Sequence, residues 1–261
     1  MSGPVRALLV DLDGVLYVED EPIPGAVEAV AALREAGLGL RFVTNTTQRS
    51  HARTLAKLQA LGMPVAADEL ITPAILAVEH CRAQGHERVA LLMAADVKAD
   101  FAALTEAEDD VDAVIVGDLG ERFDYAVLNR AFRLIVDGGA QLVALQRNRY
   151  WLRGDGLSLD VGPFVAALEY AADVEAVVVG KPAAAFFLLA LSQLGADPAE
   201  AAMVGDDVES DIGGAVRAGL RGVLVRTGKF REETLAAADP PPTDIVASIA
   251  DVPALLAAGA R

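Results

Sequence analysis

The chain has 261 residues, of which 53% are hydrophobic and 23% are charged, and its net charge is −16. This composition indicates a globular protein rather than a disordered one, and the acidic surface disfavours nucleic acids and anionic membranes as partners. The single cysteine, Cys81, excludes an intrachain disulfide. Because the N-terminus also has too few apolar residues for a signal peptide, we expect a soluble, cytoplasmic protein without a membrane span.

Short runs rich in β-branched residues and leucine alternate with alanine-rich stretches of helical pattern along the chain. The predicted strands are Ala7–Val10, Leu38–Val43, Arg88–Leu92, Ala113–Val116, Gln141–Leu145, Ala176–Val179, Ala201–Val204 and Gly222–Val225. The predicted helices are Ala26–Ala36, Arg49–Leu61, Tyr125–Val136, Phe164–Ala172, Ala184–Leu194 and Ser210–Ala218. This alternation is typical of βαβ units around a mostly parallel sheet, so the sequence predicts an α/β fold.

Polar and charged residues gather where four of the predicted strands end. They are Asp11 and Asp13 after Ala7–Val10, Thr44 and Asn45 after Leu38–Val43, Lys181 after Ala176–Val179, and Asp206, Asp207 and Asp211 after Ala201–Val204. In open α/β sheets, ligands bind beyond the carboxyl ends of the strands. We therefore expect these four strand ends to converge on one site.

The residue types at these strand ends favour a magnesium site. Two carboxylates as close as those of Asp11 and Asp13 require a nearby cation, unless one of them takes up a proton. Oxygen ligands without histidine or cysteine favour Mg²⁺ over zinc, and no histidine lies at these strand ends. Asp206 would bring a third carboxylate to the metal, with Asp207 and Asp211 completing or supporting the site.

A carboxylate at this site is also a candidate nucleophile, as in enzymes that form an aspartyl-phosphate. Lys181 would then bind phosphate oxygens as a point charge, and the hydroxyl of Thr44 would donate to the remaining ones. Each residue alone also fits a structural role, because Asn45 would cap the following helix and Lys181 would be a surface residue before Pro182. Only their occurrence together, in this order, favours a site.

Four segments resemble the four motifs of the haloacid dehalogenase-like hydrolase superfamily, in the same order. They are DLDGVLY (11–17), FVTNTT (42–47), VVGKP (178–182) and MVGDDVESDIGGA (203–215). The resemblance implies a Rossmann-like parallel-sheet core. It also implies that Asp11 is the nucleophile, and that Asp13 protonates the leaving group and then activates water.

The same resemblance assigns the remaining site residues. They are Thr44, Asn45 and Lys181 for the phosphate, and the Asp11 and Asp206 carboxylates with the backbone carbonyl of Asp13 for Mg²⁺. An acid at position 13 also disfavours dehalogenation, because the dehalogenases of the superfamily lack one there.

Residues 77–177 separate the second motif from the third and carry their own strand and helix patterns, which indicates an inserted α/β cap domain. The core domain would then comprise residues 1–76 and 178–261. This placement resembles the NagD-like, class IIA branch, whose large cap closes over the site and selects the leaving group. Arg147 and Asn148 are the cap candidates for that role, although a solvated turn with Trp151 packed beneath it fits this stretch at least as well. Homodimerisation through the cap is implied by the resemblance alone.

The resemblance therefore implies a Mg²⁺-dependent phosphatase that hydrolyses small phosphorylated metabolites through an aspartyl-phosphate on Asp11. Two alternatives stay open. One is an inorganic pyrophosphatase or a phospholysine and phosphohistidine phosphatase, although relatives of that kind carry Ser where this chain has Asp13. The other is a catalytically silent binding module of the same fold, which the presence of both Asp11 and Asp13 disfavours.

Overall fold

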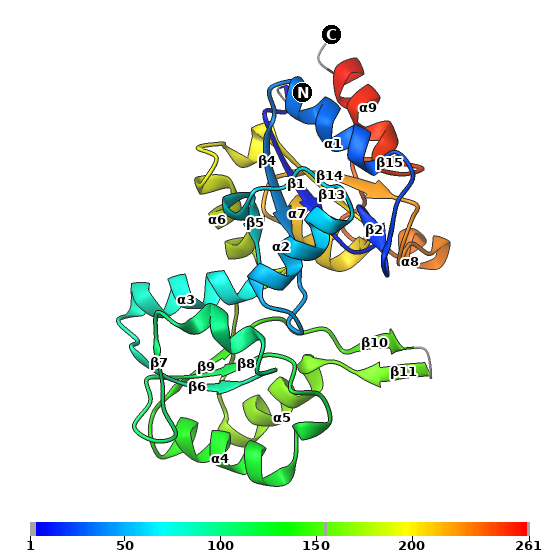
Figure 1. Ribbon diagram of the computed structural model, residues 1–261. Helices are drawn as coiled ribbons and strands as arrows, with labels where there is room; N and C mark the ends of the chain where they lie inside the picture. The colour runs from blue at the N-terminus through cyan, green and yellow to red at the C-terminus, as the bar shows by residue number, and fades with distance from the viewer. Residues whose placement is uncertain (1–3, 154–155, 260–261) are drawn as a thin grey trace. The chain divides into compact units, whose positions relative to one another are not determined.

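The computed structural model describes residues 4–153 and 156–259, which form two compact units (Figure 1). The first unit comprises the described parts of residues 1–44, 52–71 and 181–261, and the second those of residues 45–51 and 72–180. The chain therefore passes into the second unit twice, whereas the sequence predicted one insert at residues 77–177. The segment 45–51, which the sequence placed in the core domain, belongs to the second unit.

The first unit is built on a six-stranded parallel sheet. In spatial order its strands are β15 (Asp244–Val246), β14 (Arg221–Val225), β13 (Ala201–Gly205), β1 (Ala7–Asp11), β4 (Gly39–Val43) and β5 (Leu70–Ile71). The central strands β1 and β13 are buried along their whole length, which explains their nearly unbroken apolar sequences. The chain runs from β1 to β4 and β5 on one side and places β13, β14 and β15 on the other, so the strand order reverses at β1.

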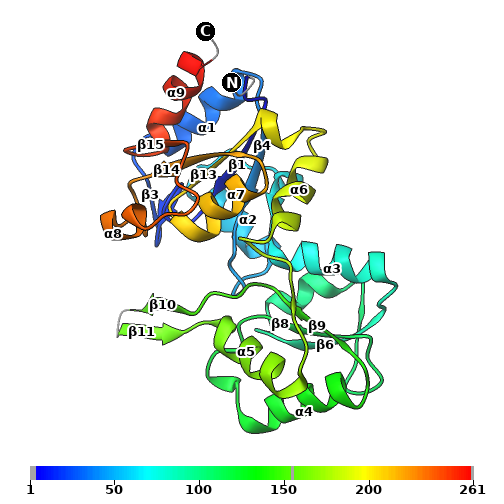
Figure 2. The same ribbon diagram turned by 180° about the vertical axis from the view of Figure 1, so that it is seen from behind.

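Helices cover both faces of this sheet. The first face carries α1 (Ala26–Glu35), α2 (His51–Ala60) and α9 (Val252–Gly259), and the second carries α6 (Ala184–Ser192) and α7 (Gly214–Arg217), as Figures 1 and 2 show from opposite sides. In α1 the buried residues Ala26, Ala29, Val30 and Leu33 recur at the spacing of one helix face, which is why this segment packs on the sheet. The unit also contains the short antiparallel pair β2 (Tyr17–Val18) and β3 (Glu21–Pro22) and the short helix α8 (Glu232–Ala236).

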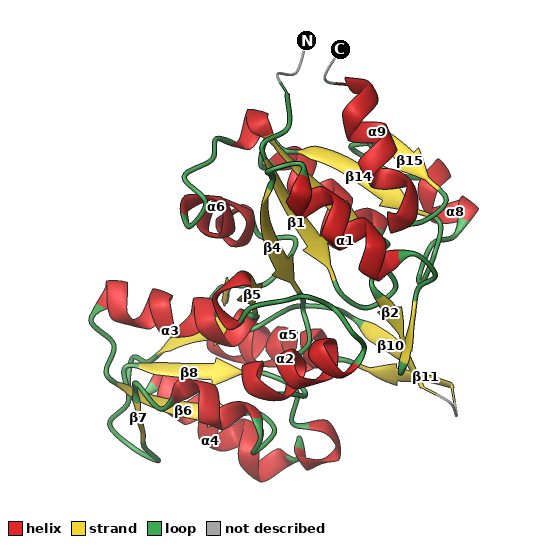
Figure 3. Cartoon of the chain, turned by 45° about the horizontal axis from the view of Figure 1, so that its top comes forward, coloured by secondary structure: helices red, strands yellow, loops and turns green. Residues whose placement is uncertain are grey.

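The second unit has a parallel sheet of its own. In spatial order its strands are β12 (Val177–Val178), β9 (Gln141–Ala144), β8 (Ala113–Val116), β6 (Arg88–Leu92) and β7 (Thr105–Glu106). Its helices are α3 (Pro73–Gln84), α4 (Tyr125–Val136) and α5 (Val161–Ala172), and β10 (Tyr150–Arg153) pairs antiparallel with β11 (Gly156–Leu159), as Figure 3 shows. Both units are thus α/β layers around parallel strands, and the predicted fold class is confirmed.

The strand predicted at Ala176–Val179 does not belong to the first unit's sheet. Only Val177 and Val178 form a strand, β12, and it pairs with β9 at the edge of the second unit's sheet. Its two residues are half-buried, unlike the fully buried strands of a sheet centre. Lys181 therefore enters the first unit just before α6, and not from the end of a strand of that unit's sheet.

Among the described residues, no helix has both the length and the apolar character needed to cross a membrane.

Candidate active site

Three buried aspartates meet at the carboxyl end of the first unit's sheet. Asp11 is the last residue of β1, and Asp206 directly follows β13, the strand paired with β1 through Val10 and Val204. Asp211 lies in a single π-helical turn, Val208–Gly213, in which the amide of Ile212 donates to the carbonyl of Asp207. One carboxylate oxygen of each aspartate lies within 4.8 Å of the other two. The wide turn thus returns Asp211 to the strand end.

A single buried lysine partly neutralises these carboxylates. Lys181 Nζ donates to Asp11 Oδ1 and to Asp211 Oδ1, at 2.6 Å in both cases. Burial and repulsion from Asp11 raise the pKa of Asp206 to about 8 and that of Asp211 to about 7. Burial lowers the pKa of Lys181, but the carboxylates of Asp11 and Asp211 together raise it by more. The pKa of Lys181 is therefore above its usual value. The ammonium of Lys229 also acts on Asp11 and Asp206 but pairs with Asp207, so the carboxylates still outnumber the ammonium groups and leave an excess of negative charge that a bound cation would relieve.

The Asp206 carboxylate fits a metal ion particularly well. Its Oδ2 accepts a hydrogen bond from the backbone N–H of Lys229 at 2.7 Å. Its Oδ1 is buried and has no hydrogen-bond partner among the described residues. A buried oxygen without a partner is costly in a folded protein, and the carboxylate that carries this one belongs to the acidic cluster. The residues present, Asp11, Asp206 and Asp211, therefore suit a hard divalent cation such as Mg²⁺.

The other predicted aspartates take different positions. Asp13 is exposed, and its Oδ2 accepts a hydrogen bond from the hydroxyl of Tyr17 at 3.1 Å. Asp207 Oδ1 accepts from the amides of Glu209 and Ser210 at 3.1 and 3.0 Å and so caps the π-helical turn. Asp207 therefore supports the turn that carries Asp211, whereas the Asp211 carboxylate itself belongs to the acidic cluster.

Thr44 lies beside this cluster. It directly follows β4, whose last residue, Val43, is paired with Asp11 of β1. The Thr44 side chain is buried, and its amide donates to the carbonyl of Ile71 at 3.3 Å. The register of β1 and β4 thus brings Thr44 to the same strand end as Asp11.

Three site residues predicted from the sequence, Asn45, Arg147 and Asn148, lie in the second unit. A Cβ on residue 180 would approach the Asn45 side chain, so glycine at this position leaves room for Asn45. Arg147 is exposed and pairs with Glu169 of α5 at 2.5 Å. The amide of Asn148 donates to Gln146 Oε1 at 2.5 Å. The side chain of Trp151, which the sequence placed beneath this turn, lies outside the described residues.

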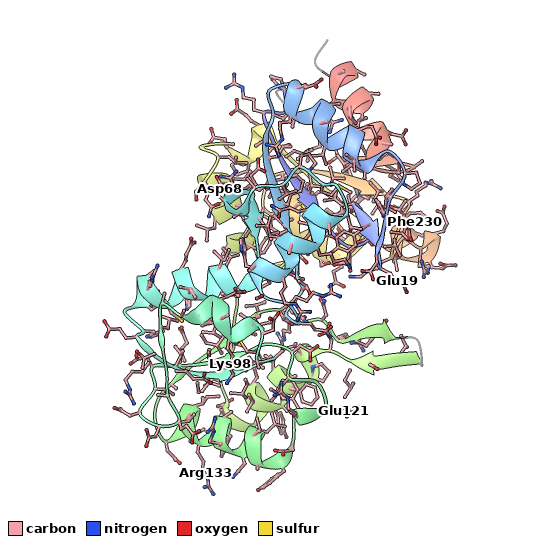
Figure 4. The ribbon with its side chains drawn as sticks, in the orientation of Figure 1. Glu19, Asp68, Lys98, Glu121, Arg133 and Phe230 are labelled. Atoms are coloured by element: carbon pink, nitrogen blue, oxygen red, sulfur yellow. The ribbon has the colours of Figure 1, made fainter. Side chains whose placement is uncertain are left out.

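The loop that follows β14, residues 226–230, also contributes to the site, although no residue of it was predicted there; it contains Phe230 (Figure 4). Thr227 Oγ1 donates to the carbonyl of Gly14 at 2.5 Å. Gly14 and Gly228 have φ values of +83° and +62°, and a Cβ on either would overlap the Asp206 carboxylate. These two glycines therefore let the backbone pack closely against Asp206 Oδ2. The only signal in the sequence is the glycine of VRTGKFR (225–231), and nothing local connects it with Asp206.

We expect the Gly228→Ala substitution to lower the affinity for Mg²⁺ by about tenfold, because it displaces a carboxylate that would hold the metal. Gly37→Ala is the matched control, because Gly37 also has a positive φ, +79°, and has no atom within 4 Å of an added Cβ. Both variants should lose about 1 kcal/mol of unfolding free energy from backbone strain, and Gly228→Ala should lose more, because its Cβ would also overlap Asp206 and Gly14. Titration calorimetry with Mg²⁺ and urea unfolding measure the two effects. Equal Mg²⁺ affinities of the two variants would contradict this assignment.

Family models match two stretches of the chain, one at each end of its sequence. Residues 8–105 match a model described as haloacid dehalogenase-like hydrolase, and residues 178–252 match one described as HAD-hydrolase-like. The chain is 46% identical over 227 residues to the bovine haloacid dehalogenase-like hydrolase domain-containing protein 2, covering 87% of this chain and 86% of the relative. It is 43% identical over 236 residues to the phospholysine phosphohistidine inorganic pyrophosphate phosphatase of Xenopus laevis, covering 88% and 86%.

Solved structures with similar folds include two phosphatases at 26% and 30% identity. The p-nitrophenyl phosphatase from Archaeoglobus fulgidus has a TM-score of 0.89 at 26% identity, with 97% of this chain and 99% of that chain covered. The glycerol phosphate phosphatase from Mycobacterium tuberculosis, solved in complex with magnesium, has a TM-score of 0.82 at 30% identity, with 94% and 76% covered.

Proposed function

The chain belongs to the haloacid dehalogenase-like hydrolases, and from this premise we propose that it is a Mg²⁺-dependent phosphatase of small phosphate esters, with Asp11 as the nucleophile. One observation supports the proposal above all others. Asp11, Asp206 and Asp211 gather at the carboxyl end of the first unit's sheet, where Lys181 pairs with Asp11 and Asp211, and Asp206 keeps a buried oxygen without a partner among the described residues.

In the first half of the proposed reaction, an oxygen of the Asp11 carboxylate forms a bond to phosphorus. The ester P–O bond breaks, and its electron pair stays on the leaving oxygen. Asp13, in its protonated form, gives its proton to that oxygen, so that an alcohol leaves. Asp13 suits this task because it is exposed to incoming substrate, whereas Asp11 is 7% exposed and faces Lys181.

In the second half, the Asp13 carboxylate removes a proton from water, whose oxygen bonds to phosphorus. The bond between Asp11 and phosphorus breaks, and the products are inorganic phosphate and the free carboxylate of Asp11. The ammonium of Lys181 and the hydroxyl of Thr44 hold phosphate oxygens in both halves. By family resemblance we extend this role to Asn45.

The Asp11 and Asp206 carboxylates and the backbone carbonyl of Asp13 would hold Mg²⁺, with Asp211 beside them. When bound, the ion would screen the repulsion between the Asp11 carboxylate and a phosphate dianion.

The substrate class stays a proposal. We favour small phosphorylated metabolites, with Arg147 and Asn148 of the second unit as candidates for leaving-group recognition. The alternative activity is hydrolysis of inorganic pyrophosphate or of phospholysine and phosphohistidine, as named for one relative. A catalytically silent binding module is the remaining alternative.

Homodimerisation through the second unit and a cytoplasmic location also stay predictions. Sedimentation equilibrium tests the homodimerisation.

We expect the purified protein to hydrolyse p-nitrophenyl phosphate in the presence of Mg²⁺ and to lose this activity in EDTA, because the buried carboxylates then lack a counter-charge. Adding Mg²⁺ back should restore the rate. A panel of phosphate monoesters, pyrophosphate, phospholysine and phosphohistidine then ranks the substrate classes by kcat/KM. The absence of any Mg²⁺-dependent hydrolysis across this panel would refute the proposal and favour a silent module.

A further inference from the structure

We propose that Tyr17 is a positioning residue for Asp13, holding the carboxyl group where it exchanges protons with the leaving group and with water. The inference rests on the proposed phosphatase reaction. It starts from a contrast between two aspartates. Asp11 is buried and bound to Lys181, whereas Asp13 is exposed and lies outside the acidic cluster. An exposed side chain samples several rotamers unless a partner fixes one.

Tyr17 is that partner. Its hydroxyl donates to Asp13 Oδ2 at 3.1 Å, and within the described part of the chain no other donor reaches the Asp13 carboxylate. The hydrogen bond engages only Oδ2, so Oδ1 is left to carry the proton that is transferred. Because a phenol both donates and accepts, Tyr17 suits Asp13 in its ionised and in its protonated form.

The segment between the two residues brings them together. Gly14 donates its amide to the carbonyl of Tyr17 at 2.7 Å, and Leu16 donates to the carbonyl of Leu12 at 2.8 Å. Gly14 has a φ of +83°, which permits the tight turn. The turn places the Tyr17 hydroxyl beside the side chain four residues before it.

Tyr17 is itself fixed in place. It is 1% exposed, and Lys57 Nζ lies 4.3 Å from the centroid of its ring. Lys57, on α2, also donates to the carbonyl of Glu19 at 2.5 Å and pairs with Asp20 at 3.1 Å. Glu19 occupies the turn between β2 and β3 (Figure 4). The ring therefore has little freedom, and its hydroxyl presents a fixed donor to Asp13.

The test uses Tyr17→Phe, which keeps the buried ring and the contact with Lys57 but removes the hydroxyl. Substrates are phosphate esters whose leaving groups range from acidic phenols to simple alcohols. Poor leaving groups need the proton from Asp13, whereas acidic phenols leave as anions. We expect kcat/KM to fall about 10- to 100-fold for alkyl phosphates and less than about threefold for p-nitrophenyl phosphate. Tyr125→Phe, at an 83% exposed tyrosine, is the control and should change neither value.

An equal loss for all leaving groups would overturn the inference, because it indicates a structural role only. So would an unchanged kcat/KM for alkyl phosphates. A double-mutant cycle adds a second criterion. In the background of Asp13→Asn, the Tyr17→Phe substitution should have no further effect on alkyl phosphates, and an additive effect would contradict the proposal.

A crystal structure of the Tyr17→Phe variant separates this inference from the proposed function. We expect the Asp13 carboxylate to adopt another rotamer or several, while Asp11 and Lys181 keep their contact. An unchanged Asp13 rotamer would overturn the positioning role even if the wild-type protein hydrolysed no phosphate ester. Inactive wild-type protein with a displaced Asp13 in the variant would refute the proposed function and leave the positioning role supported.

Discussion

Replacing Asp11 with Asn is expected to abolish turnover of every phosphate ester that the wild-type protein hydrolyses, a loss of at least about 10⁴-fold. The amide keeps the shape of the carboxylate but is a poor nucleophile, so no bond to phosphorus forms. Lys181 keeps its second partner, Asp211, at 2.6 Å, and the site should therefore stay assembled. The loss should appear in kcat for good and poor leaving groups alike, because every ester requires the same attack.

The measurement uses freshly purified variant, since deamidation would restore the wild-type residue. Asp68→Asn is the matched control, because Asp68 is exposed on the short helix Ala67–Glu69 of the first unit (Figure 4). It should have wild-type activity, and thermal unfolding of both variants checks that they are folded. Most of the activity surviving in Asp11→Asn would refute the nucleophile assignment.

Replacing Asp13 with Asn should have the second largest effect, a loss of about 10² to 10⁴ in kcat. An amide neither gives a proton to the leaving oxygen nor takes one from water. Attack by Asp11 on p-nitrophenyl phosphate needs no proton, because p-nitrophenolate leaves as an anion. The first half of the reaction should therefore proceed, while hydrolysis of the phosphorylated enzyme stalls.

Stopped-flow absorbance at high enzyme concentration separates these two halves. We expect a burst of about one p-nitrophenolate per site in Asp13→Asn, followed by a slow steady state. Asp11→Asn should show neither phase. A steady-state rate close to that of the wild-type protein, or the absence of a burst in active Asp13→Asn protein, would contradict the acid and base role of Asp13.

Long buried elements could be predicted from the sequence because their patterns are strong. The predicted helix Tyr125–Val136 and the strands Arg88–Leu92 and Ala113–Val116 have the bounds of α4, β6 and β8. The strands β5, β7 and β15 have two or three residues, too few for a periodic signal. Helix α3 was missed because residues 74–78 form a continuous apolar run, which hides the helical spacing of the buried residues Ala74, Ala77, Val78 and Cys81.

The acidic cluster was predictable because its members follow strands that the sequence reveals. Asp11 and Asp206 come directly from β1 and β13, which are neighbours in the sheet. The assignment of Asp211 to the cluster depends on the π-helical turn, which no sequence pattern indicated. Lys229 and Gly228 were missed because they reach Asp206 by tertiary contact, from a loop separated from it by the π-helical turn, α7 and β14. The bond from Tyr17 to Asp13 likewise depends on the turn at Gly14.

The most direct test is a crystal structure of the protein with Mg²⁺ and beryllofluoride, a mimic of the phosphoryl group. The expected result is a beryllofluoride joined to the Asp11 carboxylate, with Lys181 and Thr44 bound to its fluorines and Mg²⁺ held by Asp11 and Asp206. If Mg²⁺ and beryllofluoride bound elsewhere and the contact between Lys181 and Asp11 were unchanged, the result would contradict the role of Asp11 as the phosphoryl acceptor.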